Sequence, residues 1–321
     1  MKKQIFPKII GAILTIALIA TLLQQISVTD VYFMLIKINP AYLIMGFILY
    51  TISYFLRALR LHILLNREIS VKDLFSIVSI HNMALNILPA RSGELSYIYL
   101  LNKRHYKSIG EGAATLLIVR IFDIISISIL FFTSAMLAYD LPDIMINALP
   151  IVGFLLFLVI LILLMFIHQC NRFIACLRIL FTYLKYNKLH FINYILIKLD
   201  EMALSFEHIH RNEFILSFLI SAMIWITLYS VNYILVIAMG INLPLGAVFL
   251  ASTFFFMISI LPIQGIGGFG TLEGSWAISF IAVGTTKVSA ISSGFLAHII
   301  QIFYFIALFL IGFIWLRKKS E

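Results

Sequence analysis

A short polar stretch interrupts a chain that is otherwise mostly apolar. Residues 82–94 read NMALNILPARSGE. They combine two amides, a cation, an anion and two residues that disturb a helix, namely Asn82, Asn86, Arg91, Glu94, Pro89 and Gly93. A helix broken here exposes backbone N–H groups, and N–H groups at the start of a helix bind anions. With a guanidinium group beside them, this stretch is typical of a site for a phosphate group.

A second stretch repeats the order Leu-Pro, glycine, glutamate. Residues 261–273 read LPIQGIGGFGTLE and contain Pro262, Gly265, Gly267, Gly268, Gly270 and Glu273. The glycines allow unusual backbone dihedral angles, but small residues also permit close helix packing in membranes. Glu273 either complements the dipole at the start of the next helix or binds a proton or a lipid headgroup.

Two further charged pairs lie within or at the end of apolar runs, Arg57 with Arg60 and Arg120 with Asp123. The members of each pair are three residues apart and therefore share one face of a helix. Arg57 and Arg60 either extend to the membrane surface or form a basic site that receives lipid phosphate. Asp123 pairs either with Arg120 in its own helix or with Arg91, which would free Arg120 to face a cavity.

The composition indicates a membrane protein. The 321 residues are 62% hydrophobic and 12% charged, with a mean hydropathy of +1.07. Strands of a membrane barrel would alternate apolar and polar residues, and these runs do not. We predict an all-α polytopic protein with about six full transmembrane helices, because that many apolar runs are long enough to span a bilayer. They lie at about residues 9–23, 42–61, 113–139, 149–167, 214–239 and 290–316.

Basic clusters predict the orientation, because Lys and Arg gather on the cytoplasmic side. They place both the N- and the C-terminus in the cytoplasm. Residues 75–101 have basic clusters on both sides and are predicted to be a re-entrant broken hairpin that enters from the cytoplasm. Residues 247–283 have none on either side, so their broken hairpin is predicted to enter from outside. Two units, about residues 42–139 and 214–316, thus form an inverted repeat, which in transporters places the binding site between broken helices.

We expect a single integral membrane domain over residues 1–321, with a polar connector at about residues 169–212. The connector mixes Lys and Arg with aromatic and aliphatic residues, which predicts one or two amphipathic helices at the cytoplasmic surface of the membrane. A solvated linker with helical segments is the alternative. Cys170 and Cys176 lack the spacing of a metal site, and a disulfide is not expected in the cytoplasm, so we assign them no role.

Other functional classes find no support in the sequence. The formal net charge of +9 is explained by the Lys and Arg clusters at the predicted cytoplasmic ends of the spans. Nucleic-acid binding is therefore not expected. No HExxH motif, nucleophile elbow or cysteine cluster occurs. We therefore expect no enzymatic activity, no metal and no cofactor. His81, His298 and Gln301 lie in apolar segments, where hydrogen-bonded structural roles are expected.

Together these motifs resemble the lysylphosphatidylglycerol synthase transmembrane region family, the flippase-like membrane half of multiple-peptide-resistance proteins. The resemblance covers about residues 10–316 and is carried by Arg57 and Arg60, Asn86, residues 88–91 (LPAR), Gly93-Glu94, residues 120–123 (RIFD), and Pro262 through Glu273. The sequence departs from the family pattern at Val119, Ser96, Tyr97 and Leu272, where the family often has charged residues. These departures concern the substrate more than the fold.

The resemblance implies a membrane protein that moves lipids. The soluble aminoacyl-transferase domain of the full-length synthases is not found before Glu321, so lipid translocation without aminoacylation is expected. We expect a transporter of the cytoplasmic (inner) membrane that binds an anionic phospholipid or a polyprenyl-phosphate-linked headgroup between the hairpins. The expected headgroup ligands are Arg91, Arg120, Asn86, Arg57 and Arg60. The carboxylates Glu94, Asp123 and Glu273 would order the cavity or carry protons, and Pro89, Gly93, Pro262 and the four glycines would shape the breaks.

The alternative is an accessory membrane component of a lipid-linked glycan or lipid-modification pathway, acting as an enzyme partner or scaffold without transport of its own. Residues 169–212 would then bind a soluble partner. Under either hypothesis the expected partners are membrane lipids, mainly anionic ones. A homodimer and a lipid-modifying or glycosyltransferase partner are also compatible with the sequence.

Overall fold

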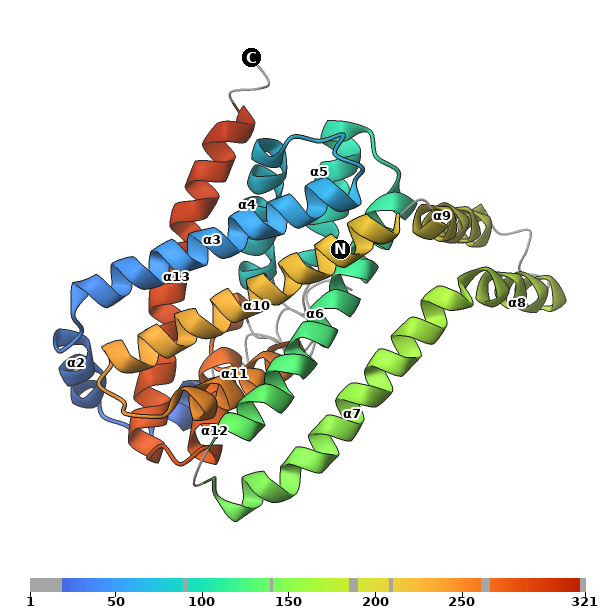
Figure 1. Cartoon of the computed structure of the whole chain (residues 1–321). Helices are drawn as coiled ribbons and strands as arrows, with labels where there is room; N and C mark the ends of the chain where they lie inside the picture. Colours follow the sequence, from blue (N-terminus) through green and yellow to red (C-terminus); the bar gives the residue numbers. More distant parts are fainter. Residues whose placement is uncertain are drawn as a thin grey trace.

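The computed structural model describes residues 19–88, 92–138, 141–184, 190–207, 210–260 and 266–317. These residues are helical apart from their connections, and none of them forms a strand. The helices in chain order are α2 (Val28–Ile36), α3 (Pro40–Leu64), α4 (Val71–Ile87), α5 (Glu94–His105), α6 (Ile109–Leu137), α7 (Asp143–His168), α8 (Cys170–Tyr183), α9 (His190–Glu207), α10 (Arg211–Ala238), α11 (Leu245–Ile260), the 3₁₀ turn η4 (Ile266–Gly268), α12 (Thr271–Ala282) and α13 (Lys287–Arg317) (Figure 1).

Among the described residues, five helices are long and apolar enough to cross a membrane. They are Pro40–Leu64, Ile109–Leu137, Met145–Phe166, Arg211–Ala238 and Lys287–Arg317. These helices match five of the six predicted full spans and confirm a multi-pass membrane protein. The sixth predicted span begins at about residue 9, and residues 9–18 of it lie outside the described part of the chain.

Two pairs of shorter helices occupy the segments predicted to be hairpins, and we call them the broken pairs. In the first, α4 ends at Ile87 and α5 begins at Glu94; in the second, α11 ends at Ile260 and α12 begins at Thr271. The two helices of each pair pack against one another. Leu88 caps α4 in an extended conformation, as expected for a residue that precedes a proline. The side from which each broken pair enters the membrane stays a prediction.

The long helices hold the broken pairs at opposite ends of the bundle. In Figure 1, α4 and α5 lie toward the top of the view and α11 and α12 toward the bottom. The most extensive contact in the molecule joins α3 to α10, and α4 packs on α13 while α11 packs on α6. The first helix of each broken pair therefore packs against the last long helix of the other predicted unit. The division into two repeat units itself stays a prediction.

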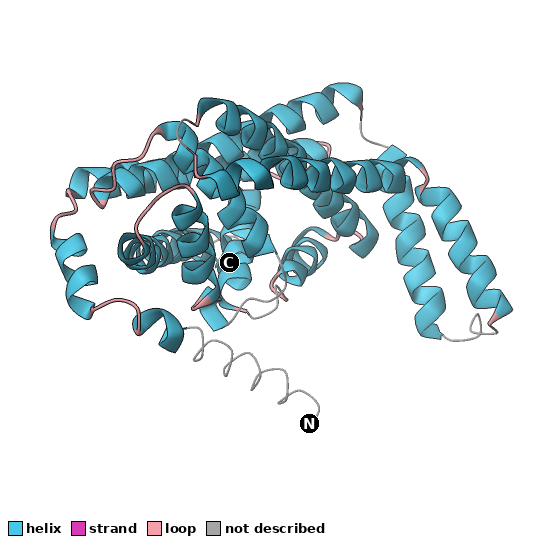
Figure 2. Ribbon diagram, turned by 90° about the horizontal axis from the view of Figure 1, so that it is seen from below, coloured by secondary structure: helices cyan, strands magenta, loops and turns pink. Residues whose placement is uncertain are grey.

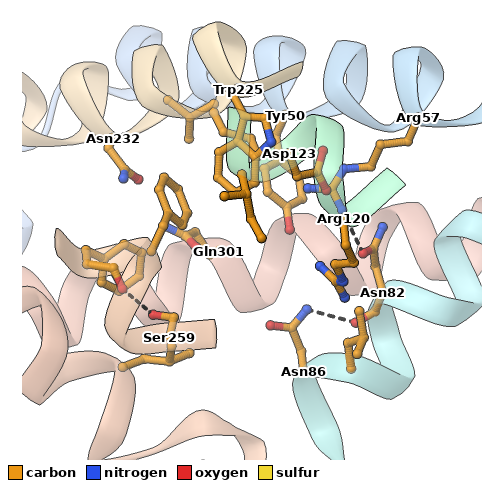
Figure 3. A pocket seen from close by; sticks show the side chains of 17 residues that line it. Tyr50, Arg57, Asn82, Asn86, Arg120, Asp123, Trp225, Asn232, Ser259 and Gln301 are labelled. Carbon is orange, nitrogen blue, oxygen red and sulfur yellow. Dashed lines mark hydrogen bonds between the residues drawn. The ribbon is translucent and has the colours of Figure 1, made fainter. Parts of the chain in front are cut away.

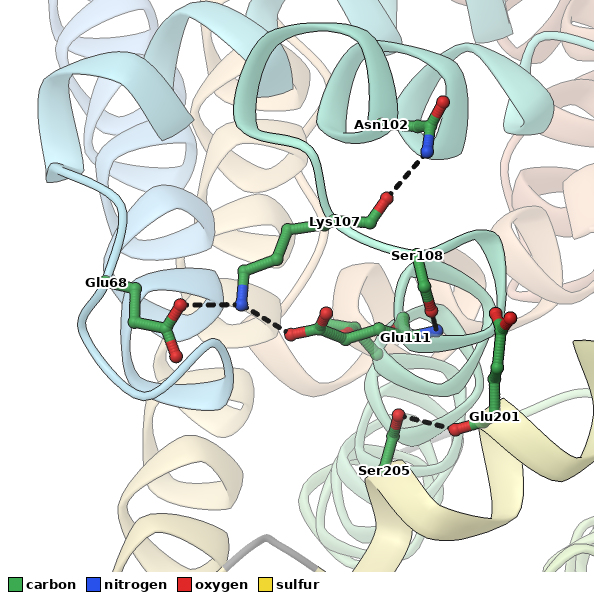
Figure 4. Close-up of polar contacts among 8 residues, drawn as sticks. Glu68, Asn102, Lys107, Ser108, Glu111, Glu201 and Ser205 are labelled. Carbon is green, nitrogen blue, oxygen red and sulfur yellow. Dashed lines mark hydrogen bonds and ion pairs between the residues drawn. The ribbon is translucent and has the colours of Figure 1, made fainter.

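Polar contacts gather the predicted cytoplasmic ends at one side of the bundle. Lys107 Nζ lies 2.8 Å from Glu68 Oε2 and 2.7 Å from Glu111 Oε1 (Figure 4). This bridge joins the α3–α4 connection to the start of α6. Burial alone would lower the pKa of the Lys107 ammonium group, but its hydrogen bonds with Glu111 and Glu68 outweigh burial and raise it. Lys72 Nζ lies 5.3 Å from the centre of the Trp315 ring, which brings the end of α13 to the same side.

The predicted connector contains two helices, α8 and α9, which project together from this side of the molecule (Figure 2). The Gly110 N–H at the start of α6 donates to Glu201 Oε2 of α9 at 3.2 Å. The pair exposes large apolar side chains such as Ile179 and Phe191, and Arg178 lies on α8. Exposed apolar groups beside cations are what amphipathic helices present to a membrane surface.

The close packing inside the first broken pair predicts a position-specific loss of stability. A Cβ atom on Gly93 would lie 2.4 Å from the carbonyl of Ala84, whereas one on Gly274 in α12 would meet nothing within 4 Å. Gly93→Ala should therefore lower the free energy of unfolding by about 1–3 kcal/mol through overpacking. Gly274→Ala should leave it unchanged or raise it, because Ala favours helix. Denaturant unfolding in detergent measures both; equal stabilities of the two variants would contradict the packing.

The orientation predicts which exposed lysines can be reached from each side. In a variant with Cys170 and Cys176 replaced by Ser, we expect a membrane-impermeant maleimide added to intact cells to label Lys287→Cys and not Lys103→Cys. Both positions are exposed, so permeabilisation should make both react. Labelling of Lys103→Cys in intact cells would show that the orientation is the reverse of the predicted one.

Candidate functional site

A cavity of about 210 Å³ lies where the two broken pairs meet the long helices, and we call it the central cavity. Close to it, α4 contacts η4. Side chains from α3, α4, α6, α10, α11, α12 and α13 line the cavity. Its polar lining consists of Tyr50, Arg57, Asn82, Asn86, Arg120, Asp123, Asn232, Ser259 and Gln301 (Figure 3). Four of the predicted site residues therefore come together here: Arg57, Asn86, Arg120 and Asp123.

Arg57 reaches the cavity from α3 and carries a free donor. Its Nη1 donates to Asn82 Oδ1 at 3.1 Å. Its Nε is buried and has no hydrogen-bond partner among the described residues, and the same holds for Asn82 Nδ2. Buried donors without acceptors are costly, at about 1–3 kcal/mol each. Both atoms belong to side chains that line the cavity, so an acceptor placed there would satisfy them.

Arg60 lies one turn further along α3 and does not line the cavity. It is 4% exposed, and its Nη1 lies 2.6 Å from Asp123 Oδ1 on α6 and 2.7 Å from Ser221 Oγ on α10. Arg60 therefore ties three long helices together. Asp123 thus pairs with Arg60 and not with Arg120, while Arg91, the other partner considered, lies outside the described residues. Arg60 is buried and does not line the cavity, which fits neither of the two alternatives considered from the sequence.

Arg120 turns from α6 toward the first broken pair. Its Nη2 lies 2.7 Å from Glu94 Oε1 at the start of α5. Glu94 thus fixes the direction of the Arg120 side chain, while the guanidinium group still lines the cavity. The two charges three residues apart on α6, Arg120 and Asp123, have separate partners on separate helices.

The charges around the cavity do not cancel. Three guanidinium groups (Arg57, Arg60 and Arg120) face two carboxylates (Asp123 and Glu94) in these contacts, which leaves one positive charge in excess. Arg57 carries the excess, because its partner Asn82 is neutral and no ion pair within the described ranges includes it. A charged side chain in the membrane interior costs at least about 2.5–3.5 kcal/mol. An anion in the cavity would offset that cost.

Glu273 does not line the central cavity. It is fully buried at the start of α12, where its Oε2 accepts the Gly270 N–H at 2.7 Å. Its Oε1 lies 2.7 Å from His298 Nδ1 on α13. The carboxylate therefore caps α12, as one of the two sequence interpretations held, and has a histidine partner that the sequence did not indicate.

The residues of the breaks are placed only in part. Gly93 lies against the backbone of α4, and Gly267, Gly268 and Gly270 have positive φ angles of 65°, 74° and 79°. Such angles strain residues with a Cβ atom, so glycine is needed for the backbone conformation there. Four predicted residues lie outside the described part of the chain: Pro89, Arg91, Pro262 and Gly265.

Several cavity residues were not predicted as site residues, namely Tyr50, Asn82, Trp225, Asn232, Ser259 and Gln301. Asn232 gave a visible signal, because an amide is rare inside an apolar span. Its Nδ2 donates to Ser252 Oγ of α11 at 3.1 Å. Tyr50 and Trp225 gave none, because aromatic residues are common in membrane helices.

The buried ion pair predicts a large effect of one substitution. Asp123→Asn leaves the Arg60 charge buried without a counter-charge and should destabilise the protein by about 3–5 kcal/mol. The matched control is Asp200→Asn in the exposed Arg178–Asp200 pair, which should change stability by less than about 1 kcal/mol. Unfolding in detergent compares the two. If Asp123→Asn were as mild as the control, the pair would not hold the helices together.

A comparison with known protein families confirms the family resemblance that the sequence motifs indicated. The family model described as "Lysylphosphatidylglycerol synthase TM region" matches residues 8–312. Neither the curated proteins nor the solved structures contain a significant match to this chain. The matched residues include every described residue that lines the central cavity, from Tyr50 to Gln301. The chain belongs to the lysylphosphatidylglycerol synthase transmembrane region family.

Proposed function

We propose that this protein transports lipids across the cytoplasmic membrane and is not an enzyme. The central cavity would bind the phosphate of an anionic phospholipid or of a polyprenyl-phosphate-linked lipid. Arg57 and Arg120 would contact the phosphate oxygens, with Asn82 and Asn86 as further donors. The observation that carries the proposal is Arg57, which forms no ion pair with the described residues and whose buried Nε has no hydrogen-bond partner among them. Guanidinium groups form their strongest hydrogen bonds with phosphate and carboxylate oxygens.

The size and lining of the cavity favour a headgroup over a whole lipid. Its volume of about 210 Å³ lies below the roughly 300–1,000 Å³ of pockets that enclose a small molecule completely. Guanidinium and amide groups line the cavity together with the aromatic rings of Trp225, Phe255 and Phe256. The headgroup would enter while the acyl or prenyl chains stay in the membrane.

The broken pairs suggest how the cavity could face each side of the membrane in turn. They lie toward opposite ends of the bundle (Figure 1), and both contribute to the cavity lining. In transporters with inverted repeats, one unit rocks against the other around a fixed central site. We propose that the first broken pair opens toward the cytoplasm and the second toward the outside.

A translocation assay tests the proposal. Purified protein in vesicles should accelerate dithionite bleaching of inner-leaflet fluorescent phosphatidylglycerol or polyprenyl phosphate, but not of phosphatidylcholine. Arg57→Gln should slow the translocation of these phosphate lipids roughly 10–100-fold, because a hydrogen bond to a charged group contributes about 1.5–3 kcal/mol. The control is Lys103→Gln, an exposed cation bonded to Tyr99 away from the cavity, which should keep wild-type rates. No acceleration with either phosphate lipid, or full activity of Arg57→Gln, would overturn the proposal.

A further inference from the structure

A buried carboxylate–histidine pair lies beside the central cavity, and neither of its two side chains lines that cavity. Glu273 is 0% exposed and His298 is 6% exposed. The Glu273 carboxylate accepts the Gly270 N–H at the N-terminus of α12, where a negative charge complements the helix dipole. An ionised carboxylate can only accept hydrogen bonds, so the proton between Glu273 Oε1 and His298 Nδ1 belongs to the histidine.

The second ring nitrogen of His298 takes no part in the contact with Glu273. Its Nε2 is buried and has no hydrogen-bond partner among the described residues. In a neutral ring protonated on Nδ1, Nε2 holds a lone pair and is the atom that would accept a proton. Phe269 packs against the ring, with 4.7 Å between the centroids.

A small chamber lies against His298 and next to the central cavity. It has a volume of about 10 Å³ and is lined in part by His298 and Gln301. A space of this size holds about one water molecule. Gln301, Leu272 and Phe255 line both the chamber and the central cavity. Gln301 therefore borders both spaces, and one water in the chamber could contact both its amide and Nε2.

We propose that the Glu273–His298 pair is a proton-binding site that opens through Gln301 onto the central cavity and couples proton uptake to the binding of the lipid anion. A hydronium ion in the chamber gives its proton to the Nε2 lone pair and remains as water, while the Nδ1–H stays bonded to Glu273. The charge of the pair changes from −1 to 0. The coupling to a lipid rests on the proposed function; the proton site does not.

The sign of the coupling follows from the charges. While Glu273 is uncompensated, its negative charge repels an anion in the adjoining cavity; protonation of His298 removes that repulsion. Anion and proton therefore each favour the binding of the other, by the same factor. Glu273 from α12 is the ionisable group in contact with the ring, and Arg57, Arg120 and Asp123 lie in the adjoining cavity. Lys72 of α4 meets α13 at Trp315, about 25 Å along the helix from His298.

Solid-state NMR of the ¹⁵N-histidine-labelled protein in vesicles tests the proton site directly, with His298→Asn identifying the signal. We expect His298 to change from the neutral to the doubly protonated ring between pH 9 and 5. Dodecyl phosphate should move the midpoint to higher pH by at least ~0.5 unit, about threefold in proton affinity, and neutral dodecyl maltoside should not. Gln301→Leu removes a polar partner of the chamber water and should move the midpoint measured without dodecyl phosphate to lower pH, while leaving the fold intact.

The outcomes separate this proposal from the transport proposal. A ring that stays in one protonation state over this range, or a midpoint that dodecyl phosphate leaves in place, would overturn the proton coupling even if lipid transport were found. If the midpoint shifts but no lipid transport is found in vesicles, the coupling between the proton and anion sites would be upheld. Only the transport proposal would then be contradicted. With both present, an inwardly directed proton gradient should speed lipid translocation in the wild type and not in Gln301→Leu.

Discussion

The ion pair between Arg60 and Asp123 is the contact on which the arrangement of charges depends. Its atoms lie 2.6 Å apart, with both side chains largely buried, and Ser221 adds a third helix to the same contact. Because Arg60 neutralises Asp123, and Glu94 neutralises Arg120, Arg57 is left with a neutral amide as its partner. Isolated charges inside a membrane protein are costly and usually mark a functional site. The structural pairs thus leave the excess charge on which the proposed preference of the central cavity for an anion rests.

The two broken pairs place this charge where a lipid headgroup could reach it. Continuous helices would satisfy all their backbone groups and leave little room between them. At the breaks, the glycines with positive φ and the close approach of Gly93 to α4 let short helices end inside the bundle. The cavity, its lining from both broken pairs and the small chamber beside His298 all follow from these interruptions. The α8–α9 pair remains outside this core and is joined to it at the start of α6.

Much of the fold could be predicted from the sequence, because span length and helix-breaking residues are local signals. The five described spans and the breaks after Ile87 and Ile260 fall where hydropathy, Pro and Gly indicated. The partners of the charges could not be predicted. Residues three apart differ by about 60° around a helix, and that difference sends Arg57 to α4 but Arg60 to α6 and α10. It likewise sends Arg120 to α5 and Asp123 to α3. Such partners depend on the rotation and depth of the packed helices, and the spacing of residues along the chain does not determine either.

The most direct test of the central claim is an electron cryomicroscopy structure of the protein in nanodiscs that contain phosphatidylglycerol. The account predicts density for one phosphate group in the central cavity, with an oxygen within about 2.7–2.9 Å of Arg57 Nε. It also predicts that Arg60 keeps Asp123 as its partner when the lipid is bound. Lipid density confined to the outer surface of the bundle, with Arg57 paired to a carboxylate of the protein itself, would contradict it.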